Sequence, residues 1–318
     1  MNDKTSLTRI VAALLGSVAC IALPFGATAV VNDWLVSAAS VVILAVSWNL
    51  AANAGLISLG HSAFWGLGSY AAILAANKLG LGLAGSLLPA LLLGAAVGAA
   101  LAVITGRLRG IFFAISTLAL SEGLRVLAVM LPGLTGGGEG LYLNPKLRPA
   151  PEVVAAFMVV GALAAVWLAW ALSRTPWHFA FRAMRANESA AQMLGVQPVR
   201  FRVGVLALAG AMAAFAGGVR IWYGGFIDPG IAFDLHITIL AQIAPILGGI
   251  HTLAGPVIGA FLGVLLSEAT RIWLGAKGVS LLVYGIALVL CILFLPQGVW
   301  GGMRAAWSRW TRRSEGRA

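Results

Sequence analysis

Long apolar runs separated by short polar segments account for most of the chain. A helix that crosses about 30 Å of hydrocarbon, rising about 1.5 Å per residue, needs roughly 20 apolar residues. Runs of about this length, bounded by charged residues, prolines or glycine clusters, occur at residues 10–31, 34–54, 63–77, 86–105, 110–131, 153–173, 203–223, 237–254, 256–273 and 279–296. The pattern predicts an all-α polytopic membrane protein with about ten transmembrane helices, forming a single membrane domain over residues 1–318.

The composition excludes an ordinary water-soluble enzyme. Hydrophobic residues make up 60% of the chain and charged residues 10%, and one soluble core could not bury so many apolar side chains. The 40 glycines suit helices that approach closely in a membrane. Cys20 and Cys291 both lie in apolar runs, and the four histidines show no ligand spacing. We therefore expect no disulfide framework, no metal site and no cofactor bound by this chain.

The basic residues predict the orientation in the membrane. Of the 21 Lys and Arg residues, fourteen lie in segments on the side of the N-terminus, five lie on the other side, and Arg125 and Arg220 fall within spans. The positive-inside rule then places both termini in the cytoplasm. The tail at residues 297–318 combines arginines with Trp307 and Trp310, which is typical of an anchor on the anionic inner leaflet rather than of a nucleic-acid-binding arm.

A cleavable signal peptide is an alternative for the first apolar run. Lys4 and Arg9 precede the run, and Ala27-Thr28-Ala29 follows it, as in a signal peptide with its cleavage site. The run is longer than a typical signal core, which favours a membrane span.

The loop at residues 174–202 is the longest one on the predicted cytoplasmic side. An amphipathic helix is predicted along residues 181–195, with a start signal at Thr175 and Pro176 and a stop at Gly195. Its apolar face includes Met193 and Leu194, and Arg185 and Glu188 lie on the opposite face. This helix either lies on lipid headgroups or docks a cytoplasmic partner; Asn187 and Glu188 favour docking.

Two glycine-rich breaks interrupt the apolar runs. Residues 48–70 contain Gly55, Gly60, Gly66 and Gly68, and residues 247–259 contain a second break. A helix broken within the bilayer must face protein or a water-filled cavity, and paired breaks point to a translocation path. We therefore expect a broken or re-entrant element whose polar side chains line the path, namely Asn49, Asn53, Ser58, His61 and Ser62. Taken alone, His61 is also compatible with a packing role at a helix start.

Ionisable residues within spans need partners, because each is costly in lipid. Glu122 with Arg125, and Glu268 with Arg271, are three residues apart and can pair on one helix face. We also assign Ser121 and Glu122 to the translocation path. An unpaired Glu122 would instead suit a secondary transporter driven by an ion gradient.

The glycine cluster at residues 134–141 does not form a phosphate-binding loop. It lacks the GK[ST] end of a Walker motif, and the predicted orientation places it outside. We expect an exposed loop in which Thr135 and Glu139 are available to an external partner protein.

Several of these stretches occur together in one known family. They read NLAANAGLISLGHSAFWGLGSYAA at 49–72, FFAISTLALSEGLRVL at 112–127, LTGGGEGL at 134–141, RAMRANESAAQMLGVQ at 182–197, LGGIHTLAGPVIGA at 247–260 and LPQGVWG near the end. In order and spacing, the sequence resembles the membrane permeases of ABC importers of the branched-chain amino acid (LIV) type, and specifically the longer of the two permeases in such a system. One departure is His251, where the family commonly has glycine.

The resemblance implies a transport subunit rather than an enzyme. It implies a second homologous permease, two cytoplasmic ATPase subunits that bind ATP and Mg, a periplasmic substrate-binding protein, a type II importer fold and a bacterial inner membrane. Residues 182–197 match the ATPase-coupling segment, and the coupling positions are Arg182, Arg185, Asn187, Glu188, Ala191 and Gly195. Thr135 and Glu139 would then face the binding protein. The substrate stays open among branched-chain amino acids, urea, amides and aromatic acids.

Overall fold

The computed structural model describes residues 16–274, 279–295 and 297–304. A helix lies over each of the ten predicted runs. These helices are Gly16–Gly26, α2 (Ala29–Asn53), α3 (His61–Leu79), α4 (Leu83–Ile104), α5 (Ile111–Met130), α7 (Pro151–Leu172), α10 (Pro198–Gly224), α12 (Leu235–Gly248), α13 (Gly255–Leu274) and α14 (Val279–Phe294). Most of the basic tail and the charged start of the proposed signal peptide lie outside the described residues.

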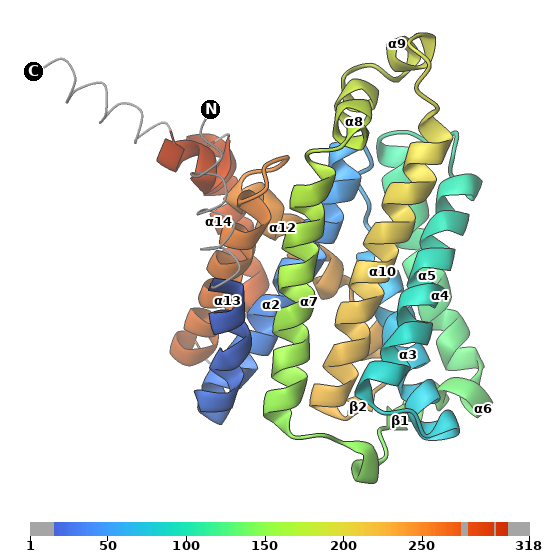
Figure 1. The fold of residues 1–318 in the computed structure, drawn as a ribbon, viewed down its shortest axis with the longest axis vertical. Coiled ribbons are helices and arrows are strands. Elements are labelled where there is room, and N and C mark those ends of the chain that lie inside the picture. The colour runs from blue at the N-terminus through green and yellow to red at the C-terminus, as the bar shows by residue number, and fades with distance from the viewer. Residues whose placement is uncertain (1–15, 275–278, 296, 305–318) are drawn as a thin grey trace, which may run out of the picture.

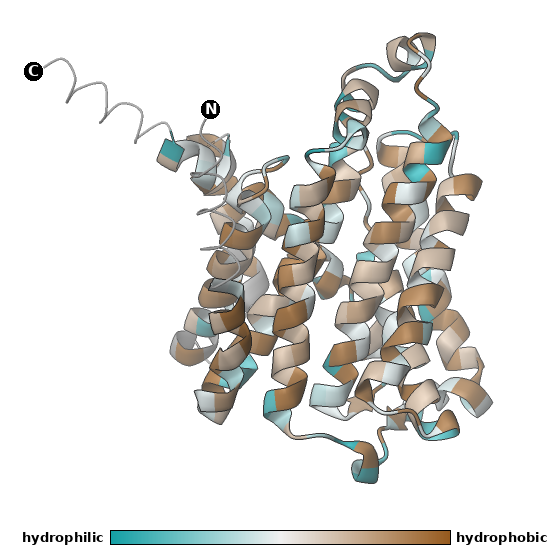
Figure 2. Ribbon diagram, in the orientation of Figure 1, coloured by the Kyte–Doolittle hydropathy of each residue, from teal (hydrophilic) through white to brown (hydrophobic). Residues whose placement is uncertain are grey.

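Six segments of the described chain are long and apolar enough to cross a bilayer. They are Ala29–Asn53, Leu83–Ile104, Ile111–Met130, Pro151–Leu172, Pro198–Gly224 and Pro229–Gly248. Hydrophobic residues cover these helices along their length, and hydrophilic residues gather at the two ends of the bundle (Figure 2). The prediction of an all-α polytopic membrane protein is confirmed, and the count of ten crossings stays a prediction.

The first two predicted spans meet at a different residue from the one expected. The first run was predicted to continue to residue 31, but its helix ends at Gly26 and α2 already begins at Ala29. Asn32, in the first turn of α2, joins the two helices, because its buried side chain donates a hydrogen bond of 3.1 Å from Nδ2 to the carbonyl of Pro24. That carbonyl lies in the last turn of the preceding helix, where it has no partner within the helix.

The short elements lie at the two ends of the bundle. At one end are α6 (Pro132–Thr135), η1 (Gly137–Glu139), β1 (Leu141–Tyr142), η2 (Pro145–Leu147), β2 (Phe226–Ile227) and α11 (Pro229–Ala232). Strands β1 and β2 pair antiparallel, with Leu141 opposite Ile227 and Tyr142 opposite Phe226. At the other end, α8 (Pro176–Ala186) and α9 (Glu188–Met193) project beyond the bundle (Figure 1).

Helix α10 forms the centre of one group of helices. It packs against α3, α4, α2 and α7. Gly94 of α4 and Gly210 of α10 face each other so closely that a Cβ atom on either residue would overlap the carbonyl oxygen of the other. Close backbone approach of this kind is how membrane helices gain packing energy in the absence of a hydrophobic driving force between them. A hydrogen bond of 2.8 Å from Trp222 Nε1 to Ser86 Oγ joins the same two helices.

Helix α2 joins this group to a second one. It contacts α10 and α7, and it also contacts α12 and α13, with α14 packed against α12 and α13. Where α2 ends, Trp48 donates a hydrogen bond of 2.9 Å from Nε1 to the carbonyl of Ser58, in the non-helical segment that leads to α3. The predicted break between α2 and α3 is therefore present, and the hydrogen bond from Trp48 holds the non-helical segment against α2.

Candidate functional site

The segment between α7 and α10 forms two helices instead of the single helix predicted for residues 181–195. Helix α8 ends at Ala186, and α9 begins at Glu188. Between them Asn187 is extended, with φ −161° and ψ 107°, and its Oδ1 accepts a hydrogen bond of 3.0 Å from the Ala190 backbone N–H. The prediction of one continuous helix was wrong because an asparagine side chain competes with the helix backbone and is more favourable as an N-cap.

Glu188 anchors the base of α9 to the bundle. Its Oε2 lies 2.8 Å from Nη2 of Arg202 in α10 and 3.1 Å from Nε of Arg109 in the connection between α4 and α5. Arg202 also donates a hydrogen bond of 2.6 Å from Nη1 to the carbonyl of Gly106. The Arg202 and Glu188 side chains are only 6% and 13% exposed. Glu188 therefore faces this protein and not the solvent.

The remaining coupling positions divide into exposed and buried ones. Arg182, Arg185, Asn187 and Gly195 are exposed, and Ala191 is buried. Gly195 has φ +86°, a left-handed conformation that suits glycine, just after α9 ends. The coupling role of these residues stays a prediction.

The tip of this segment carries two exposed apolar side chains. Met193 is 90% exposed and Leu194 is 82% exposed. Sequence reasoning placed both on the apolar face of a helix but did not identify them as highly exposed side chains. Large apolar side chains exposed on a projecting segment mark a contact surface for another protein or for lipid.

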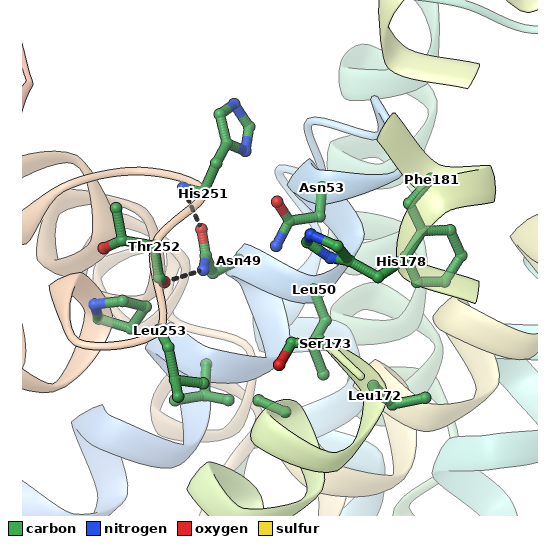
Figure 3. Close-up of a pocket in the computed structure, with 13 residues that line it drawn as sticks. Asn49, Leu50, Asn53, Leu172, Ser173, His178, Phe181, His251, Thr252 and Leu253 are labelled. Atoms are coloured by element: carbon green, nitrogen blue, oxygen red, sulfur yellow. Dashed lines mark hydrogen bonds between the residues drawn. The ribbon is translucent and has the colours of Figure 1, made fainter. Parts of the chain in front are cut away.

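A small cavity of about 70 Å³ lies beside α8 (Figure 3). The ends of α2 and α7, the start of α8 and the loop between α12 and α13 all contribute to it. Its polar lining residues are Asn49, Asn53, Ser173, His178, His251 and Thr252. Asn49 and Asn53, both assigned to the translocation path, thus lie at the end of the molecule that carries α8.

Asn49 holds the loop that connects α12 to α13. Its Nδ2 donates a hydrogen bond of 3.0 Å to the Thr252 carbonyl, and its Oδ1 accepts one of 2.9 Å from the His251 backbone N–H (Figure 3). This loop is the second predicted break. The two breaks therefore meet through one buried amide, which links α2 to the α12–α13 hairpin.

His251 has an unusual backbone conformation in this loop. Its φ of +66° lies in the left-handed region, which glycine adopts without steric cost. Burial, with a further effect of Arg185, lowers the pKa of His251 to about 4. The ring is therefore neutral at physiological pH, and it adds no positive charge beside Arg185.

Hydroxyl groups join the start of α3 to α5 and α12. The Oγ atoms of Ser62 and Ser121 are 2.7 Å apart, and Thr238 donates a hydrogen bond of 3.0 Å from Oγ1 to Ser62 Oγ. Ser58 accepts a hydrogen bond of 3.2 Å from the Gly60 N–H on its Oγ. These side chains are buried in protein, and the assignment of Ser58, Ser62 and Ser121 to the translocation path stays a prediction.

His61 is also completely buried, at 0% exposure. Neither ring nitrogen has a hydrogen-bond partner among the residues that the structure describes. The ring lies edge-on to Phe64, with 6.1 Å between centroids. In this conformation His61 is surrounded by protein, and its assignment to the path stays a prediction.

Glu122 lies on the exposed side of α5, and its neighbour Ser121 is buried. Glu122 Oε2 accepts a hydrogen bond of 2.8 Å from Arg125 Nε. The two side chains therefore neutralise each other on one helix face, as the i, i+3 spacing predicts for a structural ion pair. This geometry gives no support to an ion-coupling role for Glu122.

The two residues predicted to dock a partner at the other end differ in accessibility. Thr135 is buried, and its hydroxyl donates to the Ala128 carbonyl and accepts from the Gly137 N–H, so it shapes the turn. Glu139 is exposed in η1. In the part of the chain that the structure describes, no group of three or more His, Cys, Asp or Glu side chains could hold a metal ion.

Comparison with known proteins identifies the family. The model of the branched-chain amino acid transport system permease component matches residues 30–292. The chain belongs to this family. The family assignment confirms the resemblance to a LIV-type ABC importer permease and makes this chain a multi-pass membrane transport protein.

Individual relatives agree with the family. This permease is 28% identical over 289 residues to the high-affinity branched-chain amino acid transport system permease LivM of Salmonella typhimurium, covering 81% of this chain and 67% of that protein. It is 29% identical over 289 residues, with the same coverage, to LivM of Escherichia coli. It is 33% identical over 239 residues to the autoinducer 2 import system permease LsrC of Yersinia pseudotuberculosis, covering 72% of this chain and 65% of that protein. No solved structure matches this permease.

Proposed function

We propose that this permease provides half of the translocation path of an ATP-driven importer for branched-chain amino acids or related small polar or amphipathic molecules. Two cytoplasmic ATPase subunits, which bind ATP and Mg, would contact α8 and α9. A second homologous permease would complete the path, and a periplasmic binding protein would deliver the substrate. The names of the LivM relatives support the substrate class, although the LsrC relatives import a different molecule.

The observation that carries this proposal is the construction of the α8–α9 segment. Its tip presents Met193 and Leu194 to solvent, and its base is held to α10 by the ion pairs of Glu188. A partner that pushes on the tip therefore acts through Glu188 and Arg202 on α10. Because α10 packs against α2, α3, α4 and α7, a shift of α10 can move the bundle as a packed unit.

The distribution of charge supports a cytoplasmic position for this segment. Arginines gather at the α8–α9 end, where the sequence places Arg107, Arg109, Arg174, Arg182, Arg185, Arg200 and Arg202. The opposite end carries Lys78 in the last turn of α3, and Lys146 and Arg148 in the connection between α5 and α7. By the positive-inside rule, α8 and α9 face the cytosol of a bacterial inner membrane, and Glu139 faces the periplasmic binding protein.

Substitution of Leu194 tests whether the tip binds the ATPase subunits. Leu194→Asp places a charge in the proposed apolar contact, so the ATPase subunits should be lost from the purified complex and ATP-dependent uptake into sealed vesicles should stop. Co-purification and uptake of radiolabelled L-leucine are the measurements.

A matched control comes from the opposite end of the molecule. Leu79, at the end of α3, is 71% exposed, and Leu79→Asp should leave both co-purification and uptake unchanged. If Leu194→Asp retained the ATPase subunits as well as Leu79→Asp does, the proposed docking tip would be wrong. Uptake that persists without ATPase subunits and collapses with an uncoupler would instead establish an ion-gradient-driven transporter.

A further inference from the structure

A second cavity lies at the end of the bundle opposite α8 and α9. Its volume is about 310 Å³, within the size range of small-molecule pockets, about 300–1,000 Å³. It is formed by α3, the last turns of α10, strand β2, α11 and the start of α12. Its lining includes Trp65, Arg220, Ile227, Asp234 and Ile237.

Arg220 supplies a cation that the protein itself pairs only weakly. Its Nη1 is buried without a hydrogen-bond partner among the described residues, so this atom faces protein, and a ligand in the cavity would meet the remaining, exposed part of the side chain. Its ion-pair partner, Oδ1 of Asp33, lies 4.0 Å away, and both side chains are about 40% exposed. A pair at this distance and exposure contributes little. A guanidinium with unused donors is suited to bind a carboxylate with two parallel hydrogen bonds.

Asp234 supplies an anion to the same cavity. It is exposed at the start of α12, where its Oδ1 accepts a hydrogen bond of 2.8 Å from the His236 backbone N–H. The rest of the lining is largely apolar, with Trp65, Ile227 and Ile237 contributed by three different elements. The cavity thus combines one positive group, one negative group and apolar walls.

We propose that this cavity is a binding site on the permease for a small zwitterion with an apolar body. Arg220 would bind its carboxylate, Asp234 its ammonium group and the isoleucine walls its side chain. The inference rests on the proposed transport function and adds a selective step: the permease reads both charges of the substrate after the binding protein has released it.

The charge arrangement distinguishes this ligand from other small solutes. A simple anion bound to Arg220 would lie near the negative charge of Asp234. A simple cation bound to Asp234 would lie near the positive charge of Arg220. A neutral polyol would leave the Arg220 donors without a charged acceptor in a partly apolar site. Only a ligand with both charges satisfies both residues.

Equilibrium binding to the purified complex tests the inference without ATP and without the binding protein. The probe is radiolabelled L-leucine, and the competitors are isoamylamine, which lacks the carboxylate, and 4-methylvalerate, which lacks the ammonium group. We expect each competitor to be about ten- to hundredfold weaker than unlabelled leucine, because each leaves one charged side chain unpaired. Arg220→Gln should lose leucine affinity by a similar factor, and Arg220→Lys should lose less, since it keeps the charge without the planar fork.

Asp234→Asn has a matched control in Asp228→Asn. Asp228 caps α11 just as Asp234 caps α12, with Oδ1 accepting a hydrogen bond of 2.8 Å from the Ile231 N–H, but Asp228 does not line the cavity. Asparagine keeps both caps. Asp234→Asn should therefore weaken leucine binding while Asp228→Asn leaves it unchanged.

Several results would overturn the inference. These are no leucine binding by the wild-type complex, equal competition by leucine and either analogue, or unchanged affinity in both Arg220→Gln and Asp234→Asn. The analogue comparison uses the wild-type protein, so it stands even if a variant does not fold. The binding experiment contains no ATP, so an absence of leucine binding would leave the ATPase-docking proposal intact. Conversely, if Leu194→Asp failed to release the ATPase subunits, the leucine-binding result would still stand.

Discussion

At the scale of single residues, Glu188 and Arg202 show how one ion pair positions a segment outside the bundle. The pair is largely buried and shares Glu188 with Arg109. An exposed ion pair is worth about 0–1 kcal/mol, whereas removing one partner of a buried pair costs about 3–5 kcal/mol. The cost of losing Glu188 lies between these limits, and that loss leaves the buried Arg202 guanidinium without its carboxylate.

We therefore predict that Glu188→Ala releases α9 from the bundle. Hydrogen exchange of the backbone amides in residues 188–195 should speed up, and the melting temperature of the purified permease should fall, reflecting a loss of about 1–3 kcal/mol. Glu122→Ala is the control, because Glu122 pairs with Arg125 at the same distance of 2.8 Å but is 49% exposed. Equal exchange rates and equal melting temperatures in the two variants would contradict the anchoring role.

Local sequence patterns could not reveal these residue-scale contacts. Helical periodicity placed Glu188 on the face opposite the apolar one, but it gives no information on Arg109 and Arg202, which lie in other segments. The Glu122–Arg125 pair was predictable, since both residues lie on one helix at a known spacing. Similarly, the departure at His251 was visible in the sequence, but its left-handed backbone conformation appears only in the structure.

At the scale of elements, glycines control how closely α4 and α10 approach. The sequence predicted close helix contacts from the glycine content, but it could not say which glycines meet. Gly210 faces the backbone of Gly94, whereas Gly123 of α5 has open space where a Cβ would lie. Replacement of glycine by alanine is therefore expected to have opposite effects on stability in α10 and in α5.

Gly210→Ala should destabilise the permease, because the added methyl group overlaps the Gly94 carbonyl and forces the helices apart at a cost of about 1–3 kcal/mol. Gly123→Ala should be neutral or stabilising by up to about 1 kcal/mol, because alanine favours a helix more than glycine does. Thermal unfolding in one detergent checks both. A melting temperature for Gly210→Ala at or above that of Gly123→Ala would show that the α4–α10 contact is not as close as described.

Element positions were predicted well because apolar runs of membrane length are a strong signal. All ten runs overlap with helices, and within the described residues the ends differ by up to six residues. The exception is the α8–α9 segment, where a single asparagine divides a predicted helix. Capping by Asn187 was visible in the sequence, but amphipathic periodicity across it outweighed that signal.

At the scale of the whole molecule, α2 connects two helix groups and the functional features lie at opposite ends. One end holds the α8–α9 segment, and β2 lies at the other (Figure 1). The Asn49-bound loop lies at the first end, and the cavity lined by Arg220 and Asp234 includes β2. Sequence reasoning identified Arg220 as a charge in need of a partner, but the residues around it come from five separate elements. Local sequence patterns therefore could not predict this cavity.

The central claim is that the α8–α9 tip faces the cytosol and contacts the ATPase subunits. The most direct test labels Leu194→Cys, in a background in which Cys20 and Cys291 are replaced by alanine, with a membrane-impermeant maleimide. Labelling should occur in inverted vesicles stripped of ATPase subunits, should fail in right-side-out vesicles, and should be blocked when the ATPase subunits are added back. Labelling only from the external side, or labelling that the ATPase subunits do not block, would contradict the account.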